Sequence, residues 1–226
     1  MTRSVLIARL AEAGFDRALF DAHDLARIAQ ALKQLPPVPA LPDLTAPALP
    51  DPPAALLDEI HSAAQRGLDA MGAADAMLFA FGREKARGEL EAVCFAISES
   101  LPGWLEESET WLAQCEAGCA GMAQLREKGL AAQRGLVCLY AAARIAQSPA
   151  AGDYQAALGA LEMQLAALET QLDAAAGRMG NIAALFDTHI PAMLETALAL
   201  FDEDDRRFSP AAFRQAALRL REVANP

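Results

Sequence analysis

The residues with the clearest chemical potential are two cysteines, Cys115 and Cys119, in the stretch CEAGC. On a helix this spacing places both thiols on one face, one turn apart, where they could bind a metal ion or form a redox pair. A structural zinc site needs four ligands at recognisable spacings, and Cys94 and Cys138 supply no partner motif. We therefore interpret Cys115 and Cys119 as small side chains packed between helices.

His189 is a further candidate for a metal ligand or a general base, because it lies just before Pro191, where a helix should kink or break. The chain has three histidines. The stretch DEIH at residues 58–61 is not the Glu-x-x-His pair of di-iron bundles, because the residue three before His61 is Asp58 and no second copy exists. His189 is therefore expected to be a hydrogen-bonded or rim residue.

An acidic run, DEDD at residues 202–205, could bind a cation, but it lacks the alternating acidic spacing and central glycine of a calcium loop. A solvated turn between helices is the preferred interpretation. The sequence also has no glycine-rich phosphate loop and no Gly-x-Ser-x-Gly elbow. We assign no catalytic residue and no cofactor, although catalytic groups can assemble from distant positions.

Trp104 and Trp111 are the two tryptophans, and they lie seven residues apart on one helical stripe. As an exposed pair they would mark a docking face for a partner. As core residues they would fill the interface between helices. The core interpretation is preferred, and the docking interpretation is kept as the alternative.

The composition favours an all-α protein. Hydrophobic residues make up 54% of the 226 residues and aromatic residues only 6%, with alanine and leucine dominant and strand-forming residues sparse. Thirty acidic and nineteen basic residues give a net charge of −11. A nucleic acid is therefore not expected as a partner, because its phosphates would be repelled.

No run of eighteen uncharged apolar residues exists, so we expect no transmembrane segment. The N-terminal stretch reaches Glu12 too quickly to read as a secretory signal. We therefore expect a cytoplasmic protein, with its four cysteines as free thiols rather than disulfides.

Two long helices, over residues 104–147 and 153–190, form the centre of the predicted fold. Each carries a seam of apolar or small residues spaced by three and four, which is typical of coiled-coil-like packing. The first seam consists of Trp104, Ser108, Trp111, Cys115, Gly118, Met122, Leu125, Gly129, Ala132, Leu136, Leu139 and Ala143. The second consists of Leu158, Leu161, Leu165, Leu168, Leu172, Ala175, Met179, Ile182 and Phe186. The short loop between them predicts an elongated antiparallel hairpin.

Shorter helices complete the predicted organisation. Residues 1–34 should form a helical hairpin, with Gly14 ending the first helix and Asp21 capping the second. Residues 54–226 should form a helical bundle that contains the long hairpin. In it we expect one long helix to begin after Ser100, with Pro102 in its first turn. Ser209 and Pro210 should open a final helix.

The segment 35–53 separates these regions and holds eight of the thirteen prolines, so neither a helix nor a central strand can persist there. It could be a tether, a ligand for a proline-reading domain, or an extended strap packed on the helices. Leu35, Val38, Leu41, Leu44 and Leu49 recur at about three-residue intervals, close to the period of polyproline II, and glycine and serine are absent. We therefore predict a packed strap.

The stretch FGREKARGELEAVCFAISESL, followed by two long helices of which the second reads LGALEMQLAALETQLDAAAGRMGNIAALFDTHIPAML, resembles the toxic-anion-resistance (TelA-type) proteins. The resemblance covers about half of the chain, and in that family a comparable helix ends near a proline. It implies a cytoplasmic helical protein linked to tellurite or membrane-stress resistance, with no catalytic residues to carry over.

Three functional classes remain. The preferred one is a non-enzymatic interaction or scaffold protein that binds a protein partner, or itself, through helix faces. The second is the resistance factor implied by the resemblance. The third is a small-ligand binder or enzyme with Cys115, Cys119 or His189 in a polar cavity.

Overall fold

The computed structural model describes residues 2–75, 80–199 and 209–225, without the side chains between residues 73 and 86. The protein is 81% helical, and the described residues contain no strand, which confirms the predicted all-α fold. The chain divides into two compact units. Unit 1 comprises Met1–Ala48 and Gly118–Asp173, and unit 2 comprises Leu49–Ala117 and Ala174–Pro226.

Unit 1 begins with α1 (Arg3–Glu12), a short 3₁₀ turn η1 (Arg17–Leu19) and α2 (Ala22–Ala31). Gly14 follows α1 with a φ of 89°, the left-handed conformation that glycine adopts without strain. The Asp21 carboxylate accepts the first backbone N–H groups of α2 and so caps that helix. Both predicted helix boundaries are therefore confirmed.

Two long helices contribute to both units: α4 (Ala80–Ile145) and α5 (Ala151–Ala184). The predicted helix start after Ser100 is wrong, because α4 continues through Pro102 without a break. Ile97 and Trp104 on either side of this proline are buried in the same core cluster. Their packing outweighs the one backbone hydrogen bond that Pro102 cannot donate.

The predicted seams coincide with the buried faces of the two long helices. Every seam position of α4 and α5, together with Phe186 just beyond α5, is buried or half-buried. In unit 1, Leu161 of α5 and Leu136 of α4 belong to one core cluster, and Leu168 is also buried. The three-and-four spacing therefore gave the correct inward face of each helix.

A second core cluster of unit 1 holds α1 and α2 against the C-terminal part of α4. Leu10 and Ile28 are fully buried there with Cys138 and Ala142 of α4. The apolar side chains of α1 and α2 thus face α4. The polar side of α2 lies beside the segment that follows this helix in the chain.

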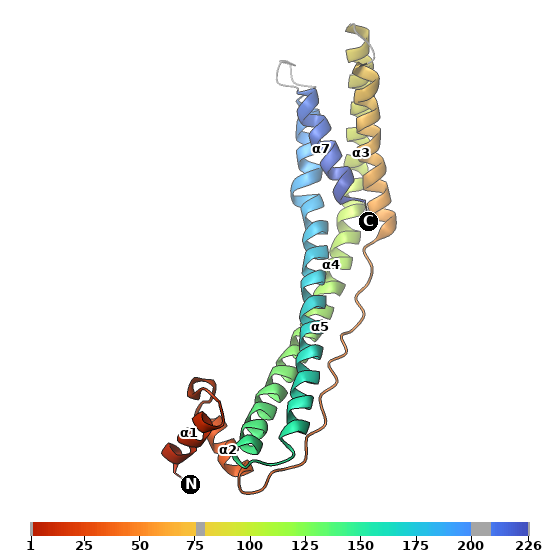
Figure 1. Ribbon diagram of the computed structural model, residues 1–226. Coiled ribbons are helices and arrows are strands. Elements are labelled where there is room, and N and C mark those ends of the chain that lie inside the picture. The colour runs from red at the N-terminus through yellow and green to blue at the C-terminus, as the bar shows by residue number, and fades with distance from the viewer. Residues whose placement is uncertain (1, 76–79, 200–208, 226) are drawn as a thin grey trace. The chain divides into compact units, whose positions relative to one another are not determined.

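Residues 35–53 form no helix or strand, and Figure 1 shows them as an extended orange trace without helical turns. Leu35, Val38 and Leu41 are half-buried against the core of unit 1, and Leu44 is only 5% exposed. Within unit 1, these side chains at three-residue intervals give the arrangement expected of a packed strap. We refer to residues 35–53 as the strap.

Gly129 of α4 allows the strap to approach closely. A Cβ atom at this position would lie 2.7 Å from Cδ1 of Leu44 and 2.6 Å from Cδ2 of Leu165 in α5. These distances are shorter than side chains tolerate. The absence of a side chain at Gly129 therefore lets Leu44 pack into the interface between α4 and α5.

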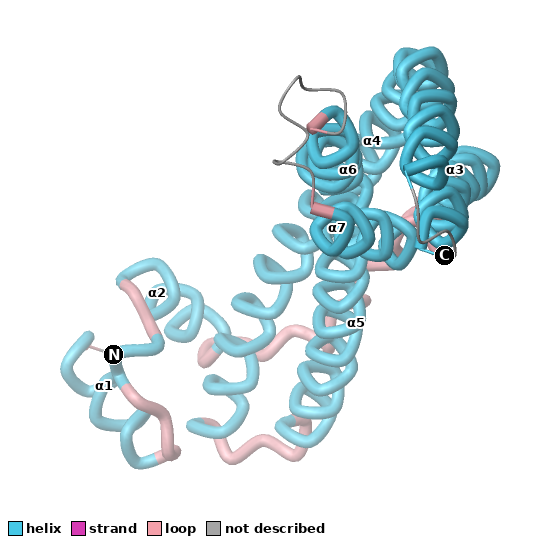
Figure 2. Tube along the Cα trace, turned by 90° about the horizontal axis from the view of Figure 1, so that it is seen from above, coloured by secondary structure: helices cyan, strands magenta, loops and turns pink. Residues whose placement is uncertain are grey.

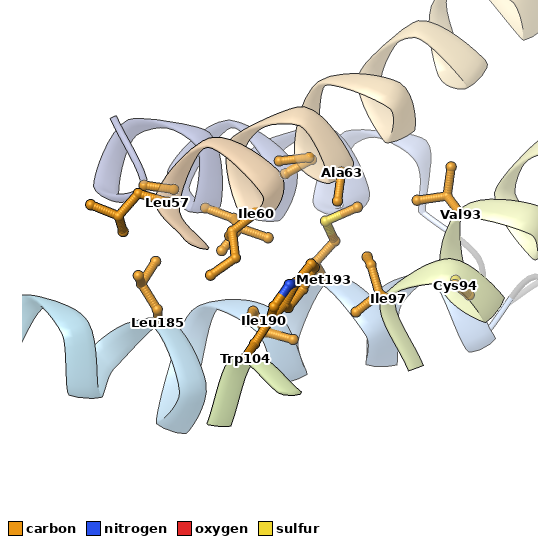
Figure 3. Close-up of a cluster of buried hydrophobic side chains, with 14 of the residues drawn as sticks. Leu57, Ile60, Ala63, Val93, Cys94, Ile97, Trp104, Leu185, Ile190 and Met193 are labelled. Atoms are coloured by element: carbon orange, nitrogen blue, oxygen red, sulfur yellow. The ribbon is translucent and has the colours of Figure 1, made fainter. Parts of the chain in front are cut away.

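Unit 2 contains α3 (Ala54–Asp75), the N-terminal part of α4 and the C-terminal part of α5, together with α6 (Ile190–Leu198) and α7 (Pro210–Val223). Figure 2 shows α7 lying next to α3 and α6, and both contacts are part of the packing of this unit. Buried side chains from α3, α4, α5, α6 and α7 meet in one core cluster. Figure 3 shows part of that cluster, with Ile60 of α3 and Met193 of α6 near Trp104.

A π-helical turn, η2 (Leu185–His189), connects α5 to α6 and lies directly before Pro191. The predicted kink at this proline is thus realised as a widened turn followed by a new helix, which begins without needing the proline N–H. At α7 the Ser209 hydroxyl accepts the Ala212 N–H at 3.2 Å, which confirms the predicted cap. None of the helices described is long and apolar enough to cross a membrane.

Candidate functional site

The two candidate thiols differ in exposure. Cys115 lies in unit 2 and is 2% exposed, whereas Cys119 lies in unit 1 and is half-buried. All four cysteines are in the described part of the chain, and none forms a disulfide. Among the residues whose side chains are described, no three His, Cys, Asp or Glu side chains are grouped so that they could hold a metal ion.

His189 is half-buried at the end of the π-helical turn. His61 has a partner in the backbone, because its Nδ1 lies 3.3 Å from the carbonyl oxygen of Arg221 in α7. Among the described side chains, neither histidine belongs to a group of residues that could hold a metal ion. The acidic run at residues 202–205 lies outside the described residues.

Trp104 and Trp111 are both buried in unit 2, at 6% and 5% exposure. The indole N–H of Trp104 donates to a carboxylate oxygen of Glu59 at 2.7 Å. The indole N–H of Trp111 donates to the carbonyl oxygen of Pro50 in the strap at 3.2 Å. The two tryptophans thus fill the core and satisfy their polar atoms there, and neither presents an exposed face.

A concave site lies in unit 1, where α2, the strap and α4 meet. It has a volume of about 510 Å³, and we call it the unit 1 groove. Its α4 side is formed by small or apolar residues, including Ala132, Gly135 and Leu136. A second wall is formed by five residues of the strap, three of them prolines: Pro36, Pro39, Ala40, Leu41 and Pro42. The polar groups come from Arg27 and Gln30 of α2 and from Gln34 just after that helix.

The position of α2 is fixed by an ion pair with α4. Asp24 is 1% exposed, and its carboxylate accepts hydrogen bonds from Arg134 Nε at 3.0 Å and Nη2 at 2.8 Å. Arg134 also forms an ion pair with Asp21, the N-cap of α2. A bidentate arginine–carboxylate contact restrains both position and orientation, so it holds α2 in a defined register on α4.

The same contact sets the charge states. Hydrogen bonding from Arg134 lowers the pKa of Asp24 to about 2, and the contact with Asp24 raises the pKa of Arg134 further above its ordinary value. Cys138 lines the groove, with its Sγ 3.6 Å from an Asp24 oxygen. Burial, and then the Asp24 charge, raise the pKa of Cys138 to about 12. The thiol is therefore neutral, and Arg27 is the charged residue that lines the groove.

A second surface feature lies on the unit 2 part of α4. At about 100° per residue, five glutamates fall within an arc of roughly 100°. All five are exposed, and we call them the acidic stripe: Glu91, Glu99, Glu106, Glu109 and Glu116. Phe95 lies within the same arc and is 63% exposed. The stripe therefore combines one sign of charge with an exposed aromatic ring.

Charge is divided unequally between the two units. Unit 2 carries 20 acidic and 10 basic residues, a net charge of −10, whereas unit 1 carries 10 acidic and 9 basic residues, a net charge of −1. Nearly all of the net charge of the chain thus belongs to unit 2. The overall net charge of −11 does not reveal this asymmetry, because each unit consists of two separate stretches of the sequence.

Sequence reasoning missed both the groove and the stripe. The stripe had a usable signal, the helical spacing of its glutamates, but ending a helix near Ser100 divided it into two parts. The groove had a weaker signal, Arg27 and Gln30 at one-turn spacing on α2. Its α4 wall comes from residues about a hundred positions away in the chain.

No protein-family model, curated protein or solved structure matches this chain. These comparisons therefore do not bear on the resemblance to the toxic-anion-resistance proteins.

Proposed function

We propose that this chain is a non-enzymatic helical interaction protein, and that the acidic stripe of unit 2 binds a partner protein through a basic surface. The observation that supports this proposal is the stripe itself, five exposed glutamates on one face of α4 with Phe95 among them. A row of like charges on a rigid helix is a surface that a complementary partner can recognise along its length.

Negative charge is concentrated around the stripe as well as over unit 2 as a whole. From residue 88 to residue 125 the sequence has seven acidic residues and no basic one. A surface of one sign raises the association rate of an oppositely charged partner, and salt weakens this effect. Phe95 would provide an apolar anchor, and the glutamates would form a charged rim around it. An anchor surrounded by a rim is typical of the energetically important contacts in protein interfaces.

A different protein is a better partner for the stripe than a second copy of this chain. Two stripes facing each other would bring ten glutamates together, and like charges across an interface are destabilising. A nucleic acid is disfavoured for the same reason. Self-association through other helix faces is compatible with the proposal but does not use the stripe.

Neutralising the stripe tests the proposal. The variant replaces Glu91, Glu99, Glu106 and Glu109 with glutamine. Its control replaces Glu12, Glu127 and Glu162 with glutamine and Asp173 with asparagine, four exposed acidic residues of unit 1. Both variants change the net charge by +4, so they separate the effect of position from the effect of total charge.

The experiment purifies partners from cells of the source organism with the wild type and both variants. Each enriched protein is then produced pure, and its Kd is measured at low and high salt. We expect a basic partner that binds the wild type and the control alike, and binds the stripe variant at least tenfold more weakly. The proposal would be contradicted if the partner bound the stripe variant and the control with equal Kd, or if no partner were purified reproducibly.

A second proposal follows from the resemblance to the toxic-anion-resistance proteins. The end of α5 at a π-helical turn just before Pro191 agrees with the family feature of a long helix that ends near a proline. Deletion of the gene should then increase sensitivity to tellurite, and reintroduction should restore growth. Unchanged growth of the deletion strain across a tellurite series would remove this alternative.

A further inference from the structure

We propose that the unit 1 groove binds an amphipathic carboxylate, a molecule with an apolar chain or ring and a single carboxylate group. This site is separate from the acidic stripe, and the inference does not depend on the proposed function. It rests on the shape of the groove, on its apolar lining, and on the exposed guanidinium of Arg27, which forms no ion pair with a described carboxylate.

The groove has the dimensions and lining of a small-molecule site. Its volume of about 510 Å³ falls within the range of roughly 300–1,000 Å³ that is usual for such sites. Ala132, Gly135 and Leu136 give an apolar surface on α4. Pro36 and Pro39 in the second wall have fixed φ angles, so that wall loses little conformational freedom when a ligand binds.

Arg27 is available to a ligand. It is exposed, and none of the described carboxylates forms an ion pair with it. Asp21 and Asp24, the acidic residues at the start of the same helix, are both paired with Arg134. The guanidinium of Arg27 can therefore bind a carboxylate through two parallel hydrogen bonds.

The remaining polar groups favour a single negative charge. The Cys138 thiol is neutral because burial raises its pKa to about 12. The carboxamides of Gln30 and Gln34 can donate further hydrogen bonds without adding charge. One cation with two neutral donors matches a monoanion, whereas a phosphate dianion would find only half of its charge compensated.

A peptide that pairs with the strap as an added β-strand would be a poor occupant of the groove. An added strand depends on backbone N–H donors along the edge that it joins. In the groove wall Pro36, Pro39 and Pro42 have no such donor. A compact apolar molecule that needs no backbone pairing fits this wall better.

Gly135 offers a direct way to obstruct the groove. A Cβ atom added there would lie 3.8 Å from Arg27 Nη1, an ordinary van der Waals contact, so the helix itself can accept a side chain. A leucine at this position would extend into the space that the ligand is proposed to occupy. Gly159 on α5 is an exposed helical glycine of the same unit with nothing near its Cβ position, so Gly159→Leu is the matched control.

The test is calorimetric titration of the full chain with decanoate, and with 1-decanol as an uncharged molecule of equal chain length. We expect one decanoate per chain. Arg27→Gln should weaken decanoate binding at least tenfold and change decanol binding less than twofold, because only decanoate loses a charged hydrogen-bond partner. Arg9→Gln, an exposed arginine on α1, should leave both unchanged.

Gly135→Leu should abolish binding of decanoate, and Gly159→Leu should not. Circular dichroism and the melting temperature establish that each variant is folded. If Gly135→Leu does not fold, the Arg27→Gln result decides alone. The proposal is overturned if decanoate does not saturate below 1 mM, if Arg27→Gln binds it as the wild type does, or if several molecules bind with no preference over decanol.

Discussion

The phenol of Tyr154, fully buried on α5, donates its hydrogen to the backbone carbonyl oxygen of Pro36 in the strap. The residues are 118 positions apart in the chain. Burial raises the pKa of Tyr154 above its ordinary value, so the phenol remains a hydrogen-bond donor at neutral pH. This bond, with the buried Leu44, holds the first part of the strap on unit 1.

Tyr154→Phe tests this anchor. The substitution keeps the ring and leaves the Pro36 carbonyl without its donor, so the free energy of unfolding should fall by about 1 kcal/mol. Limited proteolysis should cleave residues 35–48 faster than in the wild type. Tyr140→Phe is the control, because the Tyr140 hydroxyl accepts a hydrogen bond from the exposed Arg144 on the same helix. Equal proteolysis of the two variants would show that the bond does not hold the strap.

Asp24→Asn should remove a pH-dependent contribution to stability. The pKa of Asp24 in the folded protein, about 2, is below its ordinary value of 3.8. Its ionised form therefore stabilises the fold above about pH 4, and this contribution is lost as the pH falls toward 2. Because Arg134 is half exposed, we expect about 1–2 kcal/mol at pH 7.

Urea denaturation between pH 2 and pH 7 measures this difference. The gap between the wild type and Asp24→Asn should be constant above pH 5 and should narrow below pH 4. Asp173→Asn, an exposed carboxylate on α5, serves as the control. A gap that does not depend on pH would mean that Asp24 acts through packing or helix capping alone.

The end of α4 contains a suboptimal residue. Gln147 has a φ of 52°, and the Ser148 N–H bonds the carbonyl oxygen of Ala143, the pattern of a Schellman motif. Glycine is preferred at this position, so Gln147→Gly should stabilise the protein by about 0.5–1 kcal/mol. Gly14→Ala, the opposite change at the end of α1, should destabilise it by a similar amount. Thermal denaturation of both variants checks these signs.

Gly129→Val should displace Leu44 and Leu165. A Cβ atom at this position already lies within 2.7 Å of both leucine side chains, and valine adds two methyl groups. Overpacking of this kind costs roughly 1–3 kcal/mol. Gly159→Val, at an uncrowded helical glycine, controls for the helix propensity of valine. Equal stability of the two variants would contradict the close packing of the strap at Gly129.

Pro102→Ala distinguishes a continuous helix from a broken one. In a continuous α4, alanine restores a backbone donor and a favourable helix propensity at an exposed position, so stability should rise by about 1–3 kcal/mol. If a helix began at Ser100 instead, Pro102 would be favourable in its first turn, and its removal would not stabilise the chain. Chemical denaturation gives the sign.

The predictable parts of this protein were those that depend on neighbouring residues. The spacing of Leu158 and Leu161 in α5, and the caps at Asp21 and Ser209, express interactions within one or two helical turns. The course of α4 through Pro102 was not predictable in this way. It is decided by the burial of Ile97 and Trp104 among helices that are distant in sequence.

The candidate site was less accessible to sequence reasoning than the fold. Asp24 and Arg134 are 110 positions apart, and nothing in either local sequence indicates the other. Conversely, Cys115 and Cys119 are one turn apart on the same helix, but Cys115 is buried whereas Cys119 is only half-buried. Spacing along a chain shows which residues share a face, whereas the contacts of that face depend on the tertiary structure.

The division of α4 and α5 between the units has a consequence for genetic modularity. Each unit consists of two separate stretches of chain, and the chain passes from one unit to the other within the strap, within α4 and within α5. A single cut in the gene therefore cannot release either unit as one continuous polypeptide. Producing either unit alone would require joining its two stretches, unlike domains that follow one another along a chain.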